Sequence, residues 1–354
     1  MQDVIDQLTN TIRAAAANKM PLCIRGGGSK DFYGGPLRGE ALDVGAYRGI
    51  VDYEPTELVI TARAGTPLAE IEAVLHEKSQ MLAFEPPHFG SSSTLGGCIA
   101  AGLSGPRRAY SGAARDFVLG VRMLDGTGND LRFGGRVMKN VAGFDISRLM
   151  AGSLGTLGVI LEVSLKVLPL PAVETTLRLA KTAAEAIALV NEWAGQPLPV
   201  SATAWTDGNL VVRLSGAAAA VDAAAERLGG ERIDPELAPR FWHSIREHTD
   251  PFFNARQPLW RLSLKSTTPP LNLPGAQLIE WGGALRWLAA DADAQTVRAA
   301  ATFGGGHATL FRGGDKSAGV FQPLPPALLT IHHKLKRGFD PAGIFNLGRL
   351  YDWM

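Results

Sequence analysis

Cysteine is nearly absent from this 354-residue chain: only Cys23 and Cys98 occur, and they form no CxxC motif. This scarcity argues against a disulfide scaffold and against a cysteine-ligated metal or iron–sulfur cluster. No apolar run approaches the roughly 20 residues that a membrane-spanning helix needs. The first ten residues contain Asp3 and Asp6 and lack the apolar core of a signal peptide. We therefore expect a reduced, soluble, cytoplasmic protein with no direct membrane span.

An excess of charge of either sign is also missing. The 35 basic and 34 acidic residues leave a formal net charge of +1, which gives no support for binding to nucleic acid or to an anionic membrane. Hydrophobic residues make up 46% of the chain, enough to bury substantial cores. The length favours two domains.

Glycine, by contrast, is abundant, and its 41 residues cluster in motifs. The first motif, at 25–30, reads RGGGSK and follows a short apolar strand predicted at 22–24. The second, at 91–102, reads SSSTLGGCIAAG. Consecutive glycines let backbone N–H groups approach an anion with no Cβ in the way. At this spacing, the pair resembles two loops that close on the pyrophosphate and ring of a flavin dinucleotide.

The two glycine motifs also allow other interpretations. The first is no triphosphate-binding loop, because Lys30 follows Ser29 instead of preceding it, and it lacks the GxGxxG pattern of a Rossmann fold. Alone, it could be an ordinary turn, and the second could be a helix that packs closely through small residues. Their joint occurrence favours a pyrophosphate site, with the N-terminus of a short helix after Thr94 facing the anion.

Periodicity and turn signals predict the remaining elements of the N-terminal half. We expect a helix over 3–17 and a helix opened by Thr66 as N-cap and Pro67 as its first residue. Asp125-Gly126-Thr127-Gly128 predicts a hairpin between 118–124 and 131–133. Further short strands are predicted at 42–44, 50–53, 58–62 and 159–167.

A proline-rich segment at 168–171 follows the strand predicted at 159–167 and marks the predicted domain boundary. Beyond it, Thr182 to Glu185 form a capping box before a helix. A hairpin over 200–215 turns at 207–209. Helices alternating with strands then predict an α+β layout with an antiparallel sheet. These elements are helices at 217–228, 235–247, 292–302 and 324–337, and strands at 259–266, 277–281, 284–289 and 307–312.

A third glycine cluster lies between the two halves. Gly152, Gly155 and Gly158 stand at three-residue spacing and imply a tight backbone path into the strand that begins at Val159 and Ile160. Just before it, the run at 136–145 contains Lys139 and Asp145. On residue type alone, these two side chains are best interpreted as a solvated ion pair.

In this order the motifs resemble the vanillyl-alcohol-oxidase/PCMH family of flavoproteins. The RGGGS loop, STLGG, the Tyr110-x-Gly112-x-x-x-Asp116 segment, KNxxGFD and GSxGTLG cover residues 21–165. The tail at 339–346 is similar to the DPxGIxNPG ending of the family, with Leu347 where proline is usual. The modest length and the segments 281–288 and 305–312 are similar to the branch of FAD-binding subunits of bacterial glycolate oxidase.

The resemblance implies an α+β fold with a PCMH-type FAD-binding domain of two α/β subdomains at 1–170. A cap domain with an antiparallel sheet would follow at 171–322, and a C-terminal helix and tail at 323–354 would return to the FAD domain. Relatives with covalent flavin have a histidine where this chain has Ser29, so we expect non-covalent FAD. The implied FAD-binding residues are Arg25, Gly26, Gly27, Gly28, Ser29, Lys30, Thr94, Gly96, Gly97, Ala101, Gly102, Tyr110, Gly112, Gly158, Val159 and Ile160.

The resemblance also implies a function: oxidation of glycolate, a 2-hydroxy acid, to glyoxylate within a multi-subunit glycolate oxidase. Electrons would pass to a second flavoprotein subunit and an iron–sulfur subunit, and the complex could lie peripherally at the inner membrane. The HxGDGNxH and xGEHG motifs of larger catalytic relatives do not occur. Neighbouring helical positions such as His332 and His333 point about 100° apart. We therefore expect no metal site.

Hydroxyacid oxidation needs a cation for the carboxylate and a path for the hydroxyl proton, while the flavin supplies the redox chemistry. Arg261, Arg312, Lys265 and Arg286 are candidate cations, and His307 is a candidate base. Arg261 and Lys265 could instead mark the wet face of a strand, because they alternate with leucines. A self-sufficient 2-hydroxyacid dehydrogenase and a non-catalytic FAD-binding assembly subunit remain alternatives. Aromatic residues suited to a partner interface or, for most of them, to a core are Trp242, Phe252, Phe253, Trp260, Trp281 and Trp287.

Overall fold

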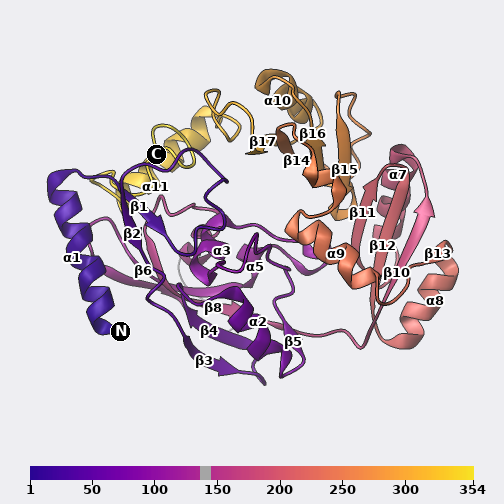
Figure 1. Ribbon diagram of the computed structural model, residues 1–354, viewed down its shortest axis with the longest axis horizontal. Coiled ribbons are helices and arrows are strands. Elements are labelled where there is room, and N and C mark those ends of the chain that lie inside the picture. Colours follow the sequence, from indigo (N-terminus) through magenta and orange to yellow (C-terminus); the bar gives the residue numbers. More distant parts are fainter. Residues whose placement is uncertain (136–144) are drawn as a thin grey trace.

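The computed structural model describes residues 1–135 and 145–354. Its strands form two large antiparallel sheets, which lie side by side as two lobes (Figure 1). The first sheet has five strands, in the spatial order β3 (Ile50–Glu54), β4 (Val59–Arg63), β8 (Val159–Lys166), β6 (Val118–Leu124) and β7 (Asp130–Gly134). The second has eight strands, in the order β13 (Glu231–Arg232), β10 (Val173–Ala180), β12 (Asn209–Gly216), β11 (Val200–Thr206), β15 (Ala276–Glu280), β16 (Leu285–Ala289), β14 (Leu259–Ser263) and β17 (His307–Arg312).

Two small sheets complete the first lobe. Strand β1 (Leu22–Arg25) runs parallel to β2 (Glu40–Asp43), and β5 (Gln80–Met81) pairs with β9 (Leu168–Pro169). The helices of this lobe are α1 (Gln2–Asn18), α2 (Leu68–His76), α3 (Leu95–Ala101), α4 (Arg108–Ser111), α5 (Ala114–Phe117) and α6 (Ile146–Leu149). The helices of the second lobe and the C-terminal tail are α7 (Ala183–Ala194), α8 (Ala218–Leu228), α9 (Ala238–Glu247), α10 (Ala294–Phe303) and α11 (Pro326–Phe339), with 3-10 turns at η1 (Pro251–Asn254) and η2 (Trp281–Gly283).

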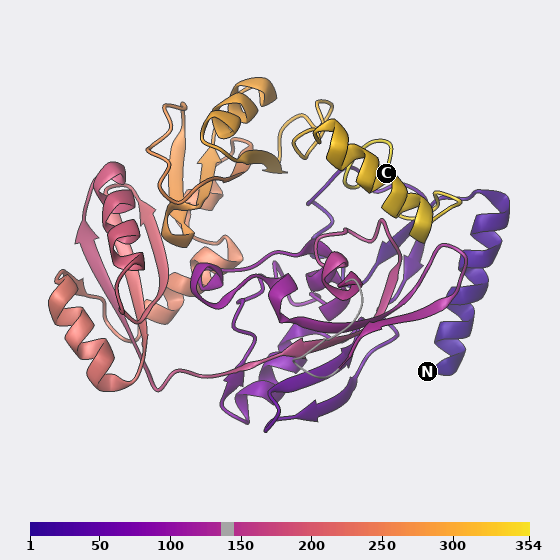
Figure 2. The same ribbon diagram turned by 180° about the vertical axis from the view of Figure 1, so that it is seen from behind.

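Helix α1 lies at the end of the molecule farthest from the eight-stranded sheet, as both views show (Figures 1 and 2). It buries Ile5, Leu8 and Ile12, which recur at helical spacing within the helix predicted over 3–17. These side chains pack in one core with Leu22 of β1 and Phe345 of the tail. The amphipathic pattern therefore predicted both the helix and its buried face.

The predicted hairpin of β6 and β7 is confirmed, and the Asp125 carboxylate builds its turn by accepting bonds from the Thr127 and Asn129 backbone N–H groups at 2.8 and 2.9 Å. The capping expected at α2 is wrong. Pro67 is the N-cap, and no side chain caps the helix there. The Thr66 hydroxyl instead accepts a bond from Gly49 N at 2.8 Å, which joins two loops.

The C-terminal tail returns to the first lobe after α11. The backbone N–H of Leu22 donates to the Ile344 carbonyl at 2.7 Å, and Asn346 N donates to the Leu22 carbonyl at 2.9 Å. The tail thus lies beside β1 in a parallel bridge. Lys336 is buried and donates to the carbonyls of Thr156 and Phe345, which fixes α11 against the same lobe.

A shared apolar cluster joins the two lobes. Tyr33, Ala101 and Leu103 of the first lobe pack with Ile245 and Trp287 of the second. The core interpretation is confirmed for five of the six aromatic residues, because their side chains are buried, and only Phe252 is half-buried. The five are Trp242, Phe253, Trp260, Trp281 and Trp287.

Lys139, one partner of the expected Lys139–Asp145 ion pair, lies outside the described residues, as does most of the KNxxGFD run. Asp145 is described and pairs with Arg148, with 2.9 Å between Oδ2 and Nε. Among the helices of 1–135 and 145–354, none has both the length and the apolar character to span a bilayer.

Candidate FAD-binding site

The first glycine loop leaves β1 and faces α3 across a cleft of about 760 Å³, counted with its open mouth. The loop at 152–158 and the C-terminal tail close the other side. The cleft is lined by Ile24, Arg25, Gly26, Gly27, Gly28, Ser29, Lys30, Asp31, Leu37, Val44, Thr94, Gly96, Gly97, Ala100, Ala101, Leu154, Gly155, Gly158, Ile160, Asn346 and Arg349. Segments separated by more than 300 residues thus meet at one site.

Most of the predicted cofactor residues lie in this cleft: the whole loop from Arg25 to Lys30, Thr94, Gly96, Gly97, Ala101, Gly158 and Ile160. Four others do not line it. Gly102 ends α3 with φ 63° against the backbone of Gly152, and Gly112 turns the chain after α4 with φ 110°. Tyr110 lies instead toward Gly282 of the second lobe, and Val159 is fully buried in the core beneath α1.

Close packing of the two glycine motifs explains the glycines at 26 and 27. A Cβ on Gly27 would overlap the carbonyl oxygen of Ser92, and a Cβ on Gly26 would lie 2.5 Å from the Thr94 hydroxyl. Gly28 has a φ of 71°, a backbone conformation that residues other than glycine rarely adopt. Access of an anion, the reason expected for these glycines, is therefore only part of the explanation. With larger residues at 26 and 27, the two loops could not pack against each other.

The donors available to an anion lie on the first loop. Within the described residues, no protein oxygen accepts a bond from the backbone N–H groups of 26–30. Successive free N–H groups of this kind form an anion-binding concavity. The expectation for α3 is wrong in this respect, because its first N–H groups donate inside the protein: Leu95 to the Thr66 carbonyl, Gly96 to the Ala64 carbonyl and Gly97 to the Thr94 hydroxyl.

Lys30 brings a positive charge into the cleft. Its ammonium donates to the Ser93 hydroxyl at 2.8 Å and to the His88 carbonyl at 3.1 Å. Burial lowers the pKa of Lys30, and the nearby Cys98 and Glu247 oppose that shift. Arg25 pairs with Asp31 at the rim. The loop therefore combines unpaired N–H donors with a partly desolvated cation, a chemistry suited to a pyrophosphate.

Sequence reasoning missed the contribution of the tail to this cleft. The Asn346 side chain accepts a bond from Ile24 N at 2.7 Å and donates to the Leu154 carbonyl at 2.6 Å. Arg349 donates to the carbonyls of Asp31, Tyr33 and Gly35 and so holds the first loop from behind. The signal available in the sequence is the GIFN ending at 343–346.

The candidate catalytic residues fall into different environments. Arg312 lies 3.3 Å from Nδ1 of the buried His248, and Arg286 donates to the Gly283 and Thr268 carbonyls. Lys265 and His307 lie on the surface, although partial burial of its ring and the nearby Arg261 lower the pKa of His307. Arg261 is half-buried, and no hydrogen bond or ion pair within the described residues occupies its guanidinium.

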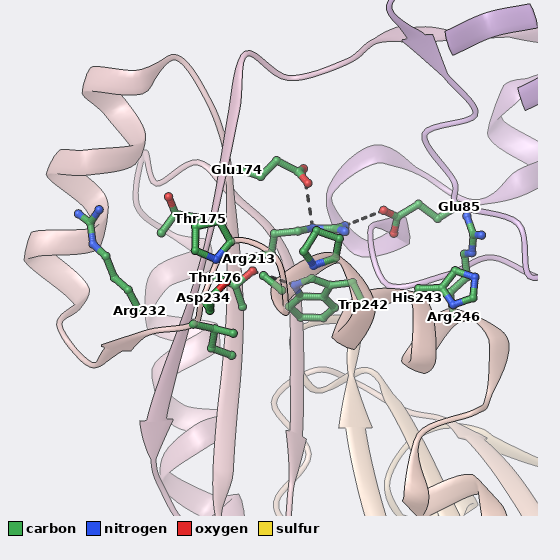
Figure 3. A pocket seen from close by; sticks show the side chains of 14 residues that line it. Glu85, Glu174, Thr175, Thr176, Arg213, Arg232, Asp234, Trp242, His243 and Arg246 are labelled. Carbon is green, nitrogen blue, oxygen red and sulfur yellow. Dashed lines mark hydrogen bonds and ion pairs between the residues drawn. The ribbon is translucent and has the colours of Figure 1, made fainter. Parts of the chain in front are cut away.

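A second, wider hollow lies on the second lobe next to the junction with the first. Figure 3 shows Arg213 at its floor, between Glu174 and Glu85, with Trp242 beneath the guanidinium. Arg232, Asp234, His243 and Arg246 line its walls. Because positive and negative side chains are mixed and the central arginine is already paired, this hollow matches no single class of ligand.

Comparison with known proteins adds the family. Residues 3–134 match the model of an FAD binding domain. The chain is 51% identical over 349 residues to glycolate oxidase subunit GlcE of Escherichia coli (strain K12). The alignment covers 99% of this chain and 98% of that protein. It is 30% identical over 177 residues to glycolate oxidase subunit GlcD of Bacillus subtilis (strain 168), covering 49% of this chain and 37% of that protein.

Among solved structures, an alkyldihydroxyacetonephosphate synthase aligns with a TM-score of 0.66 at 16% identity, covering 96% of this chain and 75% of that one. This likeness shows the fold. The predictions of an FAD-binding domain, of an α+β architecture of the PCMH type and of FAD as the cofactor are confirmed. Similarity along its whole length shows that this chain belongs to the family of glycolate oxidase subunit GlcE.

Proposed function

We propose that this chain is the FAD-binding subunit of a multi-subunit glycolate oxidase that converts glycolate to glyoxylate. The observation that carries the proposal is the cleft at 24–30: unpaired backbone N–H groups, the Lys30 cation and tightly packed glycines stand together in a chain that is similar to GlcE over its whole length. Successive free N–H groups of this kind are suited to an anionic ligand.

The residues present fit FAD. The N–H groups of 26–30 and the Lys30 ammonium would hold the pyrophosphate, and Leu37, Val44 and Ile160 offer apolar surface in the same cleft. Ser29 offers no imidazole for a covalent bond, so the FAD would be held non-covalently. When bound, FAD supplies a two-electron acceptor for the oxidation of the hydroxyl-bearing carbon. We place its domain at 1–170, the cap at 171–322 and the returning tail at 323–354.

Electrons taken up by the FAD of this subunit must pass to another electron carrier. The whole sequence has only two cysteines, both free and buried, so this chain supplies no thiolate set for an iron–sulfur cluster. We propose that a second flavoprotein subunit, similar to GlcD, and an iron–sulfur subunit receive them. Free thiols are in keeping with a reducing cytoplasm as the site of the complex, including its inner-membrane surface.

The test begins with the absorption spectrum of the purified chain supplied with FAD. We expect an oxidised-flavin band, and acid precipitation should release the flavin into the supernatant because no covalent bond holds it. The complex is then assembled from this chain, the second flavoprotein subunit and the iron–sulfur subunit and assayed with glycolate. Glyoxylate formation should require this chain. A chain that binds no FAD, or a complex equally active without it, would contradict the proposal.

Anaerobic titration of the isolated chain with glycolate separates the remaining alternatives. Bleaching of the flavin band by glycolate alone would favour a self-sufficient 2-hydroxyacid dehydrogenase. A band that bleaches only when partner subunits are present would place completion of the reaction in the complex. A variant that assembles normally with its FAD site destroyed, yet supports full activity, would identify an assembly subunit instead.

A further inference from the structure

The segment 85–90 leads into the second glycine motif and contacts both lobes. Near its end the backbone is unusual: Phe89 has a φ of 53° and Gly90 a φ of 127°. A bulky residue such as phenylalanine rarely adopts a positive φ, because its Cβ then crowds the backbone. Such a conformation costs free energy and persists only where the surrounding structure holds it. The contacts that hold the Phe89 backbone are therefore informative.

Glu247 holds this backbone from the second lobe. It is the last residue of α9, which lies on the side of the second lobe that faces the first (Figures 1 and 2). Its carboxylate accepts bonds from the backbone N–H groups of His88 at 3.0 Å and of Phe89 at 2.8 Å, and from Arg246 Nε at 2.8 Å. The side chain is only 9% exposed. A negative charge is unfavourable at the C-terminus of a helix, so α9 itself does not explain an acid at this position. The bonds to the 85–90 segment do.

Lys30 holds the same backbone from the FAD cleft. Its ammonium donates to the His88 carbonyl at 3.1 Å and to the Ser93 hydroxyl at 2.8 Å. The His88 carbonyl and the Phe89 N–H belong to one planar peptide group. The Lys30 cation and the Glu247 anion thus bond to opposite ends of the same dipole, and hydrogen bonds in such a chain polarise one another. A rotation of this peptide group would break both bonds.

The remaining contact of the Lys30 ammonium points toward a ligand. It reaches the Ser29 hydroxyl at 3.4 Å, which is longer than a normal hydrogen bond of this kind. Ser29 and Lys30 both line the FAD cleft, so a pyrophosphate oxygen could replace this weak contact and leave the two shorter bonds in place. Burial lowers the pKa of Lys30, whereas Cys98 and Glu247 raise it. Glu247 therefore supports the charge of this cation as well as its position.

We propose that Glu247 is a positioning residue for FAD binding: through the His88–Phe89 peptide group it holds the Lys30 ammonium where the pyrophosphate of the cofactor binds. The inference rests on the proposed function and states how the second lobe takes part in that FAD site. Coupling between two contacts is reciprocal. FAD bound against Lys30 should therefore stabilise the contact of α9 with the first lobe.

A double-mutant cycle tests whether Glu247 acts through Lys30. Fluorescence titration of the apoprotein measures the FAD affinity of the wild type, Glu247→Gln, Lys30→Met and the double variant. Glu247→Gln should weaken FAD binding about tenfold, within the roughly 2- to 100-fold coupling typical of residues in one hydrogen-bond network. In the Lys30→Met background the same change should have little effect, because the cation that Glu247 positions is gone.

Two further variants complete the cycle. Glu247→Asp keeps the charge and should retain part of the affinity that Glu247→Gln loses. Glu226→Gln makes the same change at an exposed glutamate of α8, in the same lobe, and should leave FAD binding unchanged. Circular dichroism checks that each variant folds, and Glu247→Asp provides the comparison if Glu247→Gln does not fold.

Hydrogen exchange reads the peptide group directly. The amide hydrogens of His88 and Phe89 are the ones that Glu247 accepts, so they should exchange faster in Glu247→Gln than in the wild type. Adding FAD should slow their exchange in the wild type, because bound FAD fixes Lys30 and Lys30 fixes the His88 carbonyl. The slowing should be smaller in Glu247→Gln and in Lys30→Met.

Each outcome decides for or against the inference. FAD binding that is unchanged or tighter in Glu247→Gln would overturn it, while FAD bound by the wild type would leave the proposed function standing. Equal losses from Glu247→Gln in the wild-type and Lys30→Met backgrounds would also overturn it, since the effect would then bypass Lys30. If Lys30→Met binds too little FAD for the cycle, equal slowing of exchange by FAD in the wild type and Glu247→Gln overturns it instead. If the expected coupling is found but the complex oxidises glycolate equally without this chain, the proposed function fails and the role of Glu247 stands.

Discussion

Glu85 and Arg213 form an ion pair across the junction of the two lobes, with 2.8 Å between Oε1 and Nη2 (Figure 3). Glu85 follows β5 in the first lobe and adopts φ 47°, whereas Arg213 is buried on β12 of the second lobe. Arg107, which precedes α4, pairs with Glu174 of β10 in the same network. The position of the eight-stranded sheet beside the first lobe thus depends on charges contributed by both lobes.

The pair predicts a marked loss of stability when one partner is removed. Glu85→Gln and Arg213→Met should each lower the free energy of unfolding by about 1 to 3 kcal/mol, because the remaining charge stays at the junction with only its longer pair, Arg213 with Glu174 or Glu85 with Arg107. The double variant should lose much less than the sum. Urea denaturation measures all three. Arg232→Met is the control, since the exposed Arg232–Asp222 pair contributes about 1 kcal/mol at most. Additive losses in the double variant would show that the two residues do not act as a pair.

The approach of the two glycine motifs predicts the effect of a single methyl group on FAD binding. Gly27→Ala places a Cβ against the Ser92 carbonyl oxygen, so the loop must move away and its N–H groups lose their arrangement. We expect the FAD affinity to fall at least about tenfold, a change of roughly 1.4 kcal/mol, measured by fluorescence titration of the apoprotein. Gly338→Ala in α11 meets no atom within 4 Å and should leave FAD binding unchanged. Unaltered affinity in Gly27→Ala would contradict the packing argument.

Glu280 predicts a pH dependence of stability. Its pKa is raised to about 8 in the folded protein, so the folded state holds a proton that the unfolded state releases near pH 4.5. Stability from this group is therefore complete at low pH and declines as pH rises from about 4.5 to about 8. Glu280→Gln should remove this decline while still accepting the Trp287 bond. Thermal melts of both proteins from pH 5 to pH 9 should diverge with rising pH and run parallel above pH 8. Parallel curves throughout would show that Glu280 titrates normally.

Asn346 predicts a link between the C-terminal tail and the cofactor site. Its amide satisfies the Ile24 N–H and the Leu154 carbonyl, and its backbone has φ 44°. Asn346→Leu leaves both backbone groups buried without partners, which should cost about 2 to 4 kcal/mol of stability and weaken FAD binding as the cleft wall shifts. Melting temperature and FAD titration measure the two effects. Asn18→Leu, at an exposed amide on α1, should change neither by much. A normal FAD affinity in Asn346→Leu would show that the tail does not influence FAD binding.

Local sequence patterns were sufficient for most elements of this fold. The alternation of apolar residues predicted α1, and the Asp125 to Gly128 run predicted the β6–β7 turn, because both depend on side chains a few residues apart. The two glycine motifs likewise predicted two loops that line one cleft. Thr66 shows the limit of such reasoning: its hydroxyl found a partner in Gly49, 17 residues away, and left the helix uncapped.

Only the tertiary structure decided which residues meet. The tail amide of Asn346 reaches Ile24 across 322 positions of sequence, and Arg261 proved to be the unpaired arginine because Arg286 and Arg312 have partners in the fold. The raised pKa of Glu280 depends on burial by both lobes, which no local pattern encodes. The sequence by itself therefore determined the elements and the glycine loops, since these follow from short-range geometry. Long-range packing decided which charged groups are paired, which backbone N–H donors stay free and which residues line the site.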